Sequence, residues 1–279
     1  MTFNINPLFS PSKYSHDFFT VRKYPTYYKT ILQRTVRNRG IEDGQEVRNF
    51  TAKGEAGNIG KLSNNISRAK SRVFELAFCN PWELYVTLTL NKEKYDRYNL
   101  YNFKKDLSQF IRDYRKKYSV DIKYLLVPEK HKDGAWHMHG LLYGLPIEHL
   151  YKFSLSEKLP YRIRERIESG TDVYTWKDYE NKFGFSDIEC IKDHEAVSKY
   201  ILKYITEDLT RTITELNAHM FYASKGLKCS EIVCRDIAEH GILNPDYSNE
   251  YCSVKFSNSL DEALSAVINI ENRLRYENI

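Results

Sequence analysis

The chain has 279 residues, enough to bury a sizeable core in one or two domains. Its 42% hydrophobic residues exclude a disordered chain, and no apolar run reaches the roughly 18 residues of a membrane-spanning helix. The net charge of +5 permits nucleic-acid binding without requiring it, and 22 tyrosines are an unusual surplus. Five scattered cysteines form no CxxC pair, and the N-terminus lacks a secretory pattern. We therefore expect a reduced, cytoplasmic protein.

Three parts follow one another along the chain. Residues 1–62 are polar, with basic clusters and a glycine-rich stretch, and are expected to form a basic N-terminal extension, either an arm or a small subdomain. Residues 63–228 carry the clearest periodicity and are expected to form the main domain, with an insertion at about 145–182. Residues 229–279 are expected to form a C-terminal helical extension.

Helical and strand periods alternate through the main domain. Strict alternation in 83–90 predicts a half-buried strand, and apolar spacing in 99–118 predicts a helix that buries its apolar stripe. The order of elements predicts an α+β fold, a central antiparallel sheet of about five strands with helices packed on one face. The expected strands are 83–90, 122–129, 136–143, 183–191 and 219–223; the expected helices start at 63 and run over 99–118, 193–209 (capped by Asp193) and 259–275.

The strongest local motif is His137-Met138-His139 in the third strand. Because side chains alternate along a strand, both imidazoles point to one face and can converge on one divalent cation. A histidine pair on a strand is, however, often only a polar solvent-facing surface. A metal site needs further ligands, and the preceding strand offers Glu129 and His131.

The register of the hairpin decides which of these residues faces the histidines. A three-residue turn of Lys132-Asp133-Gly134, with Gly134 left-handed, pairs His131 with Ala135 and places Glu129 opposite His137. A two-residue turn instead pairs Glu129 with Met138 and turns the carboxylate away. We prefer Glu129 as the third ligand, because a carboxylate suits Mg²⁺ or Mn²⁺ whereas an all-histidine site favours zinc.

A second motif lies on the helix expected after Asp193. Tyr200 and Tyr204 are spaced i, i+4, so their hydroxyls can address the same place, and Lys203 flanks Tyr200 on the polar side. Tyr204 lies near the centre of an apolar stripe and Tyr200 near its edge, so the alternative is that Tyr204 packs in the core. Tyrosine has a pKa of about 10, yet it can attack a phosphodiester when a divalent ion polarises the phosphate.

Together these motifs resemble those of the HUH endonucleases, specifically the rolling-circle replication initiators. Tyr85–Leu90 is similar to the first motif, His137-Met138-His139 to the His-hydrophobic-His motif, and Tyr200–Tyr204 to the catalytic YxxK motif with a second tyrosine. The similarity runs from about Asn64 to Lys228. It is closest to phage and plasmid replication proteins related to the filamentous-phage gene II protein.

The resemblance implies a ferredoxin-like HUH fold and an Mg²⁺- or Mn²⁺-dependent nick in one DNA strand. It implies that Glu129 is the third metal ligand and Tyr200 the nucleophile, which keeps the 5′ phosphate and leaves a 3′ hydroxyl to prime synthesis. Tyr204 matches the second tyrosine, but Glu207 stands where a second lysine often follows. Lys203 is the expected helper of the tyrosines, and Trp136 and Lys199 are the expected DNA contacts.

Other interpretations of the same motifs stay open. A transposase or mobilisation relaxase uses similar chemistry, and a non-catalytic nucleic-acid-binding module can have a similar fold. A two-histidine phosphoesterase needs two separate motifs, whereas HMH occurs once. No phosphate-binding loop of the form GxxxxGK[ST] is present, so a separate host helicase and polymerase are the expected partners of a plasmid- or phage-encoded protein in a bacterial cytoplasm.

Overall fold

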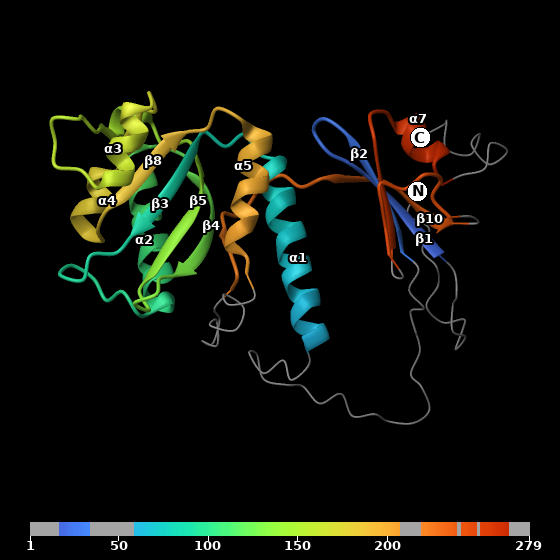
Figure 1. The fold of residues 1–279 in the computed structure, drawn as a ribbon, viewed down its shortest axis with the longest axis horizontal. Coiled ribbons are helices and arrows are strands. Elements are labelled where there is room, and N and C mark those ends of the chain that lie inside the picture. Colours follow the sequence, from blue (N-terminus) through green and yellow to red (C-terminus); the bar gives the residue numbers. More distant parts are fainter. Residues whose placement is uncertain (1–16, 34–58, 207–218, 239–240, 250–251, 268–279) are drawn as a thin grey trace. The chain divides into compact units, whose positions relative to one another are not determined.

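The computed structural model describes residues 17–33, 59–206, 219–238, 241–249 and 252–267, which fall into two compact units (Figure 1). The larger unit comprises residues 51–229. The smaller unit joins both ends of the chain, residues 1–50 and 230–279. No helix in the described ranges has the length and apolar character needed to cross a bilayer.

A seven-stranded antiparallel sheet forms the centre of the larger unit, in the order β6-β7-β8-β3-β5-β4-β9. The five predicted strands are all present, which confirms the α+β class and the antiparallel sheet. The insertion adds two short strands at one edge. The strands are β3 (Leu84–Thr89), β4 (Lys123–Lys130), β5 (Trp136–Tyr143), β6 (Tyr151–Lys152), β7 (Val173–Thr175), β8 (Ser186–Cys190) and β9 (Tyr222–Ala223).

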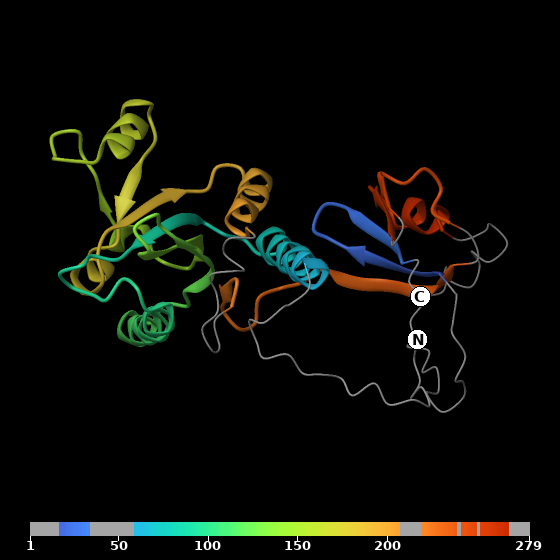
Figure 2. The same ribbon diagram turned by 60° about the horizontal axis from the view of Figure 1, so that its bottom comes forward.

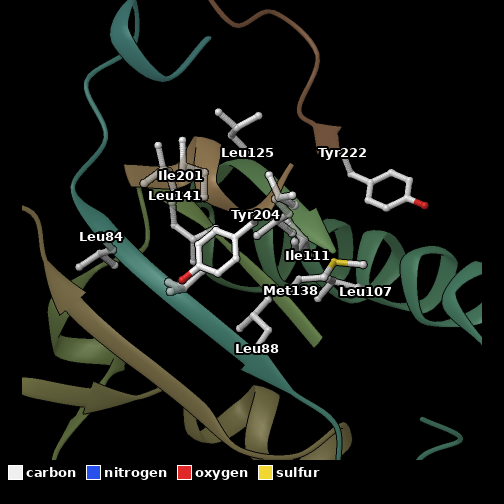
Figure 3. Close-up of a cluster of buried hydrophobic side chains, with 14 of the residues drawn as sticks. Leu84, Leu88, Leu107, Ile111, Leu125, Met138, Leu141, Ile201, Tyr204 and Tyr222 are labelled. Carbon is white, nitrogen blue, oxygen red and sulfur yellow. The ribbon is translucent and has the colours of Figure 1, made fainter. Parts of the chain in front are cut away.

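Helix α2 (Leu100–Tyr118) covers one face of this sheet. It begins where the Asn99 side chain accepts a hydrogen bond from the Asn102 N–H, which satisfies one of the unpaired amides of the first turn. Its buried residues recur at helical spacing and form the predicted apolar stripe: Leu100, Phe103, Leu107, Phe110, Ile111 and Tyr114. Figure 3 shows Met138 of β5 directed toward this helix, beside Leu107 and Ile111.

The opposite face packs against a second set of helices. The elements on this side of the sheet are α1 (Ile59–Phe78), α5 (His194–Tyr200) and the 3₁₀ turn η2 (Ile201–Tyr204). The expectation that helices cover only one face is therefore wrong. Leu125 and Leu141 pair across β4 and β5 on the histidine side of the sheet, and these apolar side chains are buried there with Ile201 (Figure 3).

The insertion at 145–182 folds as a small extension of the sheet. Besides β6 and β7 it holds the 3₁₀ turn η1 (Ile147–His149), α3 (Tyr161–Glu168) and α4 (Lys177–Lys182). Helix α3 packs Ile163 with Phe153 and Val173. Figure 2 shows α3 and α2 on opposite sides of the sheet.

The smaller unit is a five-stranded antiparallel sheet in the order β10-β1-β2-β12-β11, with helix α7 (Leu260–Ser265) packed on one face. This corrects the expectation of separate terminal extensions, because β1 pairs with β10 and β2 with β12, and so segments from the two chain ends share one sheet. The strands are β1 (Asp17–Lys23), β2 (Tyr28–Gln33), β10 (Glu231–Ala238), β11 (Tyr247–Ser248) and β12 (Cys252–Ser257).

Two predicted helices are only partly described. The helix expected over 193–209 starts as predicted, since Asp193 accepts a hydrogen bond from the Ala196 N–H, but it tightens into η2 after Tyr200. The helix expected over 259–275 begins at its Ser259 cap as α7. Residues 207–218 and 268–279 lie outside the described residues.

Candidate metal and tyrosine site

The β4–β5 hairpin sets the geometry of the site. Its turn has the three-residue form, with Gly134 at φ +85° and the His131 N–H donating to the Ala135 carbonyl over 2.8 Å. Glu129 lies directly opposite His137, which confirms the register predicted from this turn. The alternative two-residue register, which would turn the carboxylate to the other face, is excluded.

A close backbone contact explains the glycine after the second histidine. A Cβ atom at Gly140 would lie 2.3 Å from the carbonyl oxygen of Leu125 on β4, so no larger residue fits without moving a strand. Because Gly140 has no side chain, β4 can lie close to β5, which is the strand that carries the two histidines.

Glu129, His137 and His139 form a group that can hold a metal ion. Their potential ligand atoms all lie within 4.8 Å of one another. One carboxylate oxygen, Glu129 Oε2, lies 2.9 Å from His137 Nε2 and 2.8 Å from His139 Nε2. Two nitrogens and one carboxylate converging from a single sheet face suit a divalent cation that keeps open positions for another ligand.

Neighbouring side chains fix the orientation of His139. Its Nδ1 lies 3.1 Å from the Thr87 hydroxyl and 3.3 Å from the Tyr85 hydroxyl, both on the adjacent strand β3. The Tyr204 ring stacks on the imidazole with the centroids 3.9 Å apart and the planes 10° apart. These contacts hold Nε2 toward Glu129, as outer partners of metal-binding histidines commonly do.

We expect Thr87→Val to weaken Mn²⁺ binding by about tenfold or more, because the hydroxyl that orients His139 is lost while the side-chain shape is kept. Titration calorimetry on the full chain measures this change. Thr89→Val is the matched control, since Thr89 lies opposite His137 on the same strand face and its side chain makes no hydrogen bond to a histidine among the described residues. Equal affinities of the two variants would contradict this role for Thr87.

Burial sets the protonation of the three residues. Desolvation lowers the pKa of His137, and lowers that of His139 to about 4 with a further contribution from the neighbouring His137. Burial alone would raise the pKa of Glu129, but hydrogen bonding to His137 and the charge of the two histidines lower it overall. The folded site therefore offers neutral imidazoles and an ionised carboxylate near neutral pH.

These shifts predict that Mn²⁺ binding resists mild acid. Two histidines of ordinary pKa, about 6.5, would together lose affinity about 100-fold at about pH 5.5, because protons compete for the ligand nitrogens. With both pKa values lowered, we expect a loss of less than about tenfold relative to about pH 7.5. A Mn²⁺ titration across this range measures it, and a loss of about 100-fold would contradict the proposed protonation states.

The two motif tyrosines differ in environment. Tyr200 is 47% exposed, whereas Tyr204 is 8% exposed and donates or accepts a 2.8 Å hydrogen bond with the Tyr85 hydroxyl. The Lys203 ammonium lies 3.5 Å from the centre of the Tyr200 ring and 4.7 Å from that of Tyr204. The burial of Tyr204 and the exposure of Tyr200 agree with their predicted positions, Tyr204 near the centre of the apolar stripe and Tyr200 at its edge.

The same neighbours shift the two phenol pKa values in opposite directions. For Tyr200, burial acts to raise the pKa, but hydrogen bonding to the Lys203 ammonium and to Tyr204 outweighs it, and the pKa is lowered. For Tyr204, burial and the hydrogen bond to Tyr85 raise the pKa well above its ordinary value. Tyr200 is thus the exposed and more acidic phenol, and Tyr204 the buried and less acidic one.

The two residues expected to contact DNA, Trp136 and Lys199, differ in their exposure to solvent. Trp136 is 3% exposed, because alternation along β5 places it on the α2 face, opposite the histidines. The expectation that it stacks on unpaired bases is therefore wrong. Lys199 is exposed on α5 and forms an ion pair with Glu195 at 2.6 Å.

Sequence reasoning misses several residues of this sheet face. Alternation places Tyr85 and Thr87 on one strand face, but only the pairing of β3 with β5 reveals their link to His139. Next to them on β8, Asp187 lies opposite Thr87. Arg166 of α3 binds Asp187 through both carboxylate oxygens and lies 2.6 Å from a Glu189 oxygen, so it is neutralised rather than displayed to solvent.

Residues 83–209 match the family model of the replication-associated proteins of the ORF2 and gene II protein type. A search of curated proteins and a search of solved structures found no significant match to the chain. The matched segment contains the whole site, from Tyr85 through Glu129 and the two histidines to Tyr204. The match supports a replication initiator family and, with it, a role in DNA replication.

Proposed function

We propose that this protein initiates rolling-circle replication by nicking one DNA strand through Tyr200, in the manner of an HUH endonuclease. The observation that carries the proposal is the connected arrangement of an exposed, more acidic tyrosine and a group of side chains that can hold a metal ion. Tyr204 stacks on His139 and lies beside Tyr200, with ring centroids 6.0 Å apart. Both groups lie within the segment that matches the replication family.

The reaction is a transesterification. The Tyr200 oxygen forms a bond to the scissile phosphorus and releases its proton, while the bond from phosphorus to the 3′ oxygen breaks and that oxygen gains a proton. Lys203 stabilises the phenolate that attacks, since its ammonium lies against the Tyr200 ring. The products are a 5′ phosphotyrosine and a free 3′ hydroxyl, and because the bond energy is retained the step can be reversed.

Glu129, His137 and His139 would hold the divalent ion, for which we propose Mg²⁺ or Mn²⁺ on the strength of the carboxylate ligand. When bound, such an ion neutralises charge on the scissile phosphate and orients it. The chain itself supplies the rigidity, because Thr87 and Tyr85 hold His139 on one side and Tyr204 packs on its ring.

We assign Tyr204 a positioning role in this mechanism. Its hydroxyl is engaged by Tyr85, its ring covers His139, and its raised pKa disfavours the phenolate that an attack requires. One tyrosine then carries out the cleavage. Tyr204 could be a second catalytic tyrosine or a packed core residue, and we propose the packed role. Lys203 then acts as a partner of Tyr200 alone.

A covalent-adduct assay tests the proposal. The full chain is mixed with a labelled single-stranded oligonucleotide that contains the replication origin, and the products are separated on a denaturing gel. We expect a protein-linked DNA band with Mg²⁺ or Mn²⁺ and none with a chelator. Binding of the oligonucleotide without any covalent product would favour a non-catalytic DNA-binding module instead.

Helicase and polymerase activities are proposed to come from the host.

A further inference from the structure

The smaller unit has two different sheet faces. On one face Phe19 and Leu32 form a core with α7, and the Thr30 hydroxyl donates to the Ala263 carbonyl. The other face carries no helix among the residues that the structure describes. We call it the outer face; its register positions include Phe18, Thr20, Arg22, Lys29, Ile31, Gln33, Ile232, Arg235, Tyr247, Cys252, Val254 and Phe256.

Exposed aromatic rings lie at one side of the outer face. Tyr247 on β11 is 54% exposed and Phe256 on β12 is 47% exposed. Tyr247 lies opposite Val254, two residues from Phe256 along β12, so both rings stand on the same face of neighbouring strands. Tyr27, in the turn before β2, meets the Phe256 ring edge-on with the centroids 5.5 Å apart and extends this aromatic group.

Basic side chains lie on the strands beside these rings. Arg22 on β1 pairs with Lys29 on β2, which in turn pairs with Phe256, so two cations and one ring follow one another across the sheet. Arg235 on β10 occupies the next row and is exposed. The charged residues at the described register positions of the outer face are therefore all basic.

The acidic residues of the same strands occupy the helix face. Asp236 pairs with Phe19, and Glu231 pairs with Lys23, both at positions on the α7 side by the alternation of the strands. Lys23 and Lys255 also occupy the helix face, so that face carries charges of both signs, whereas the charged register positions of the outer face are basic only.

We infer that the outer face binds single-stranded nucleic acid. Exposed rings provide flat surfaces on which unpaired bases stack whatever their sequence, and adjacent cations neutralise the phosphates of the same strand. A second copy of the chain docked face to face would set these basic charges against one another, which is unfavourable. This inference goes beyond the proposed nicking activity, because it concerns a second surface in the other compact unit and requires neither Tyr200 nor a metal.

The test measures binding of a fluorescent oligo(dT), about 15 nucleotides long and without origin sequence, to the full chain in a metal chelator. We expect Tyr247→Ala combined with Phe256→Ala to weaken binding by about tenfold or more, because two stacking rings are removed. The conservative pair Tyr247→Phe with Phe256→Tyr keeps both rings and is expected to bind like the unaltered protein. We call the double alanine variant the ring-free pair and the conservative variant the ring-keeping pair. Equal affinity of these two variants for the oligonucleotide would overturn the inference.

The basic residues give a second, independent readout. Arg235→Gln is expected to lower the slope of log affinity against log salt by about 0.7, the value for one phosphate contact on a single strand. Lys23→Gln is the matched control, since Lys23 is an exposed cation on the α7 side of the same sheet. Equal slopes for the two variants would argue against a phosphate contact at Arg235.

Photo-cross-linking identifies the surface without any substitution. An oligo(dT) that carries iodinated uracil is irradiated with the unaltered protein, and we expect the linked peptides to include Tyr247 or Phe256. Cross-links confined to residues 59–229 would overturn the inference. A change of oligomeric state, and not of DNA affinity, in the ring-free pair would overturn it too and assign the face to contact between copies. Adduct formation through Tyr200 is measured separately and is unaffected by either outcome.

Discussion

Tyr200→Phe is expected to abolish the covalent protein–DNA product. The substitution removes only the attacking oxygen, and it keeps the ring that meets Tyr85 edge-on and lies under the Lys203 ammonium. Loss of a nucleophile leaves only background catalysis, so we expect the rate to fall by about 10³-fold or more. Labelled oligonucleotide retained on the protein in a denaturing gel, followed over time, measures it.

Tyr204→Phe is the matched control for this experiment. It removes the hydrogen bond to Tyr85 but keeps the ring stacked on His139, so we expect a loss of about tenfold or less. Both variants retain their ring volume, and a folding defect is not expected in either. If the product survived in Tyr200→Phe and disappeared in Tyr204→Phe, the assignment of nucleophile and positioning residue would be reversed.

His139→Ala is expected to remove Mn²⁺ binding to the site and, with it, metal-dependent cleavage. The substitution deletes a ligand nitrogen and also the ring on which Tyr204 packs. Glu129→Gln separates these effects, because it keeps all the packing around the histidines and removes only the ionised carboxylate that both imidazoles contact. We expect it to weaken Mn²⁺ binding by about 100-fold in titration calorimetry, on the scale of lost metal contacts.

His131→Ala provides the control for general loss of imidazole. The His131 ring lies 4.1 Å from that of His137, centroid to centroid, yet His131 is outside the group whose ligand atoms converge. We expect its removal to leave Mn²⁺ affinity within about threefold of the unaltered protein. A site that depended on His131 as strongly as on His139, and not on Glu129, would favour the all-histidine alternative and a preference for zinc.

The hairpin can be predicted from sequence because its determinants are local. Gly134 in a short turn fixes the register, and alternation then places Glu129 opposite His137. The same holds for α2, whose buried stripe follows from its spacing. The burial of Tyr204 likewise follows from its position near the centre of an apolar stripe, since a few residues of a helix suffice to define a face.

What could not be predicted depends on pairing between distant segments. The link from Tyr85 and Thr87 to His139 requires that β3 lies beside β5, which no local pattern encodes. The sheet of the smaller unit pairs β1 with β10 and β2 with β12, so its strands come from the two ends of the chain, and neither end alone shows which strands it pairs with. The burial of Trp136 follows from alternation, but only once β5 is known to carry α2 on its other face.

The measurement that most directly tests the central claim is mass-spectrometric identification of the residue that carries DNA after reaction with an origin oligonucleotide. We predict a metal-dependent phosphotyrosine linkage at Tyr200, with the 5′ end of the cleaved strand attached. DNA linked through any other residue, or cleavage that leaves the protein unmodified in the presence of Mg²⁺ and Mn²⁺, would contradict it.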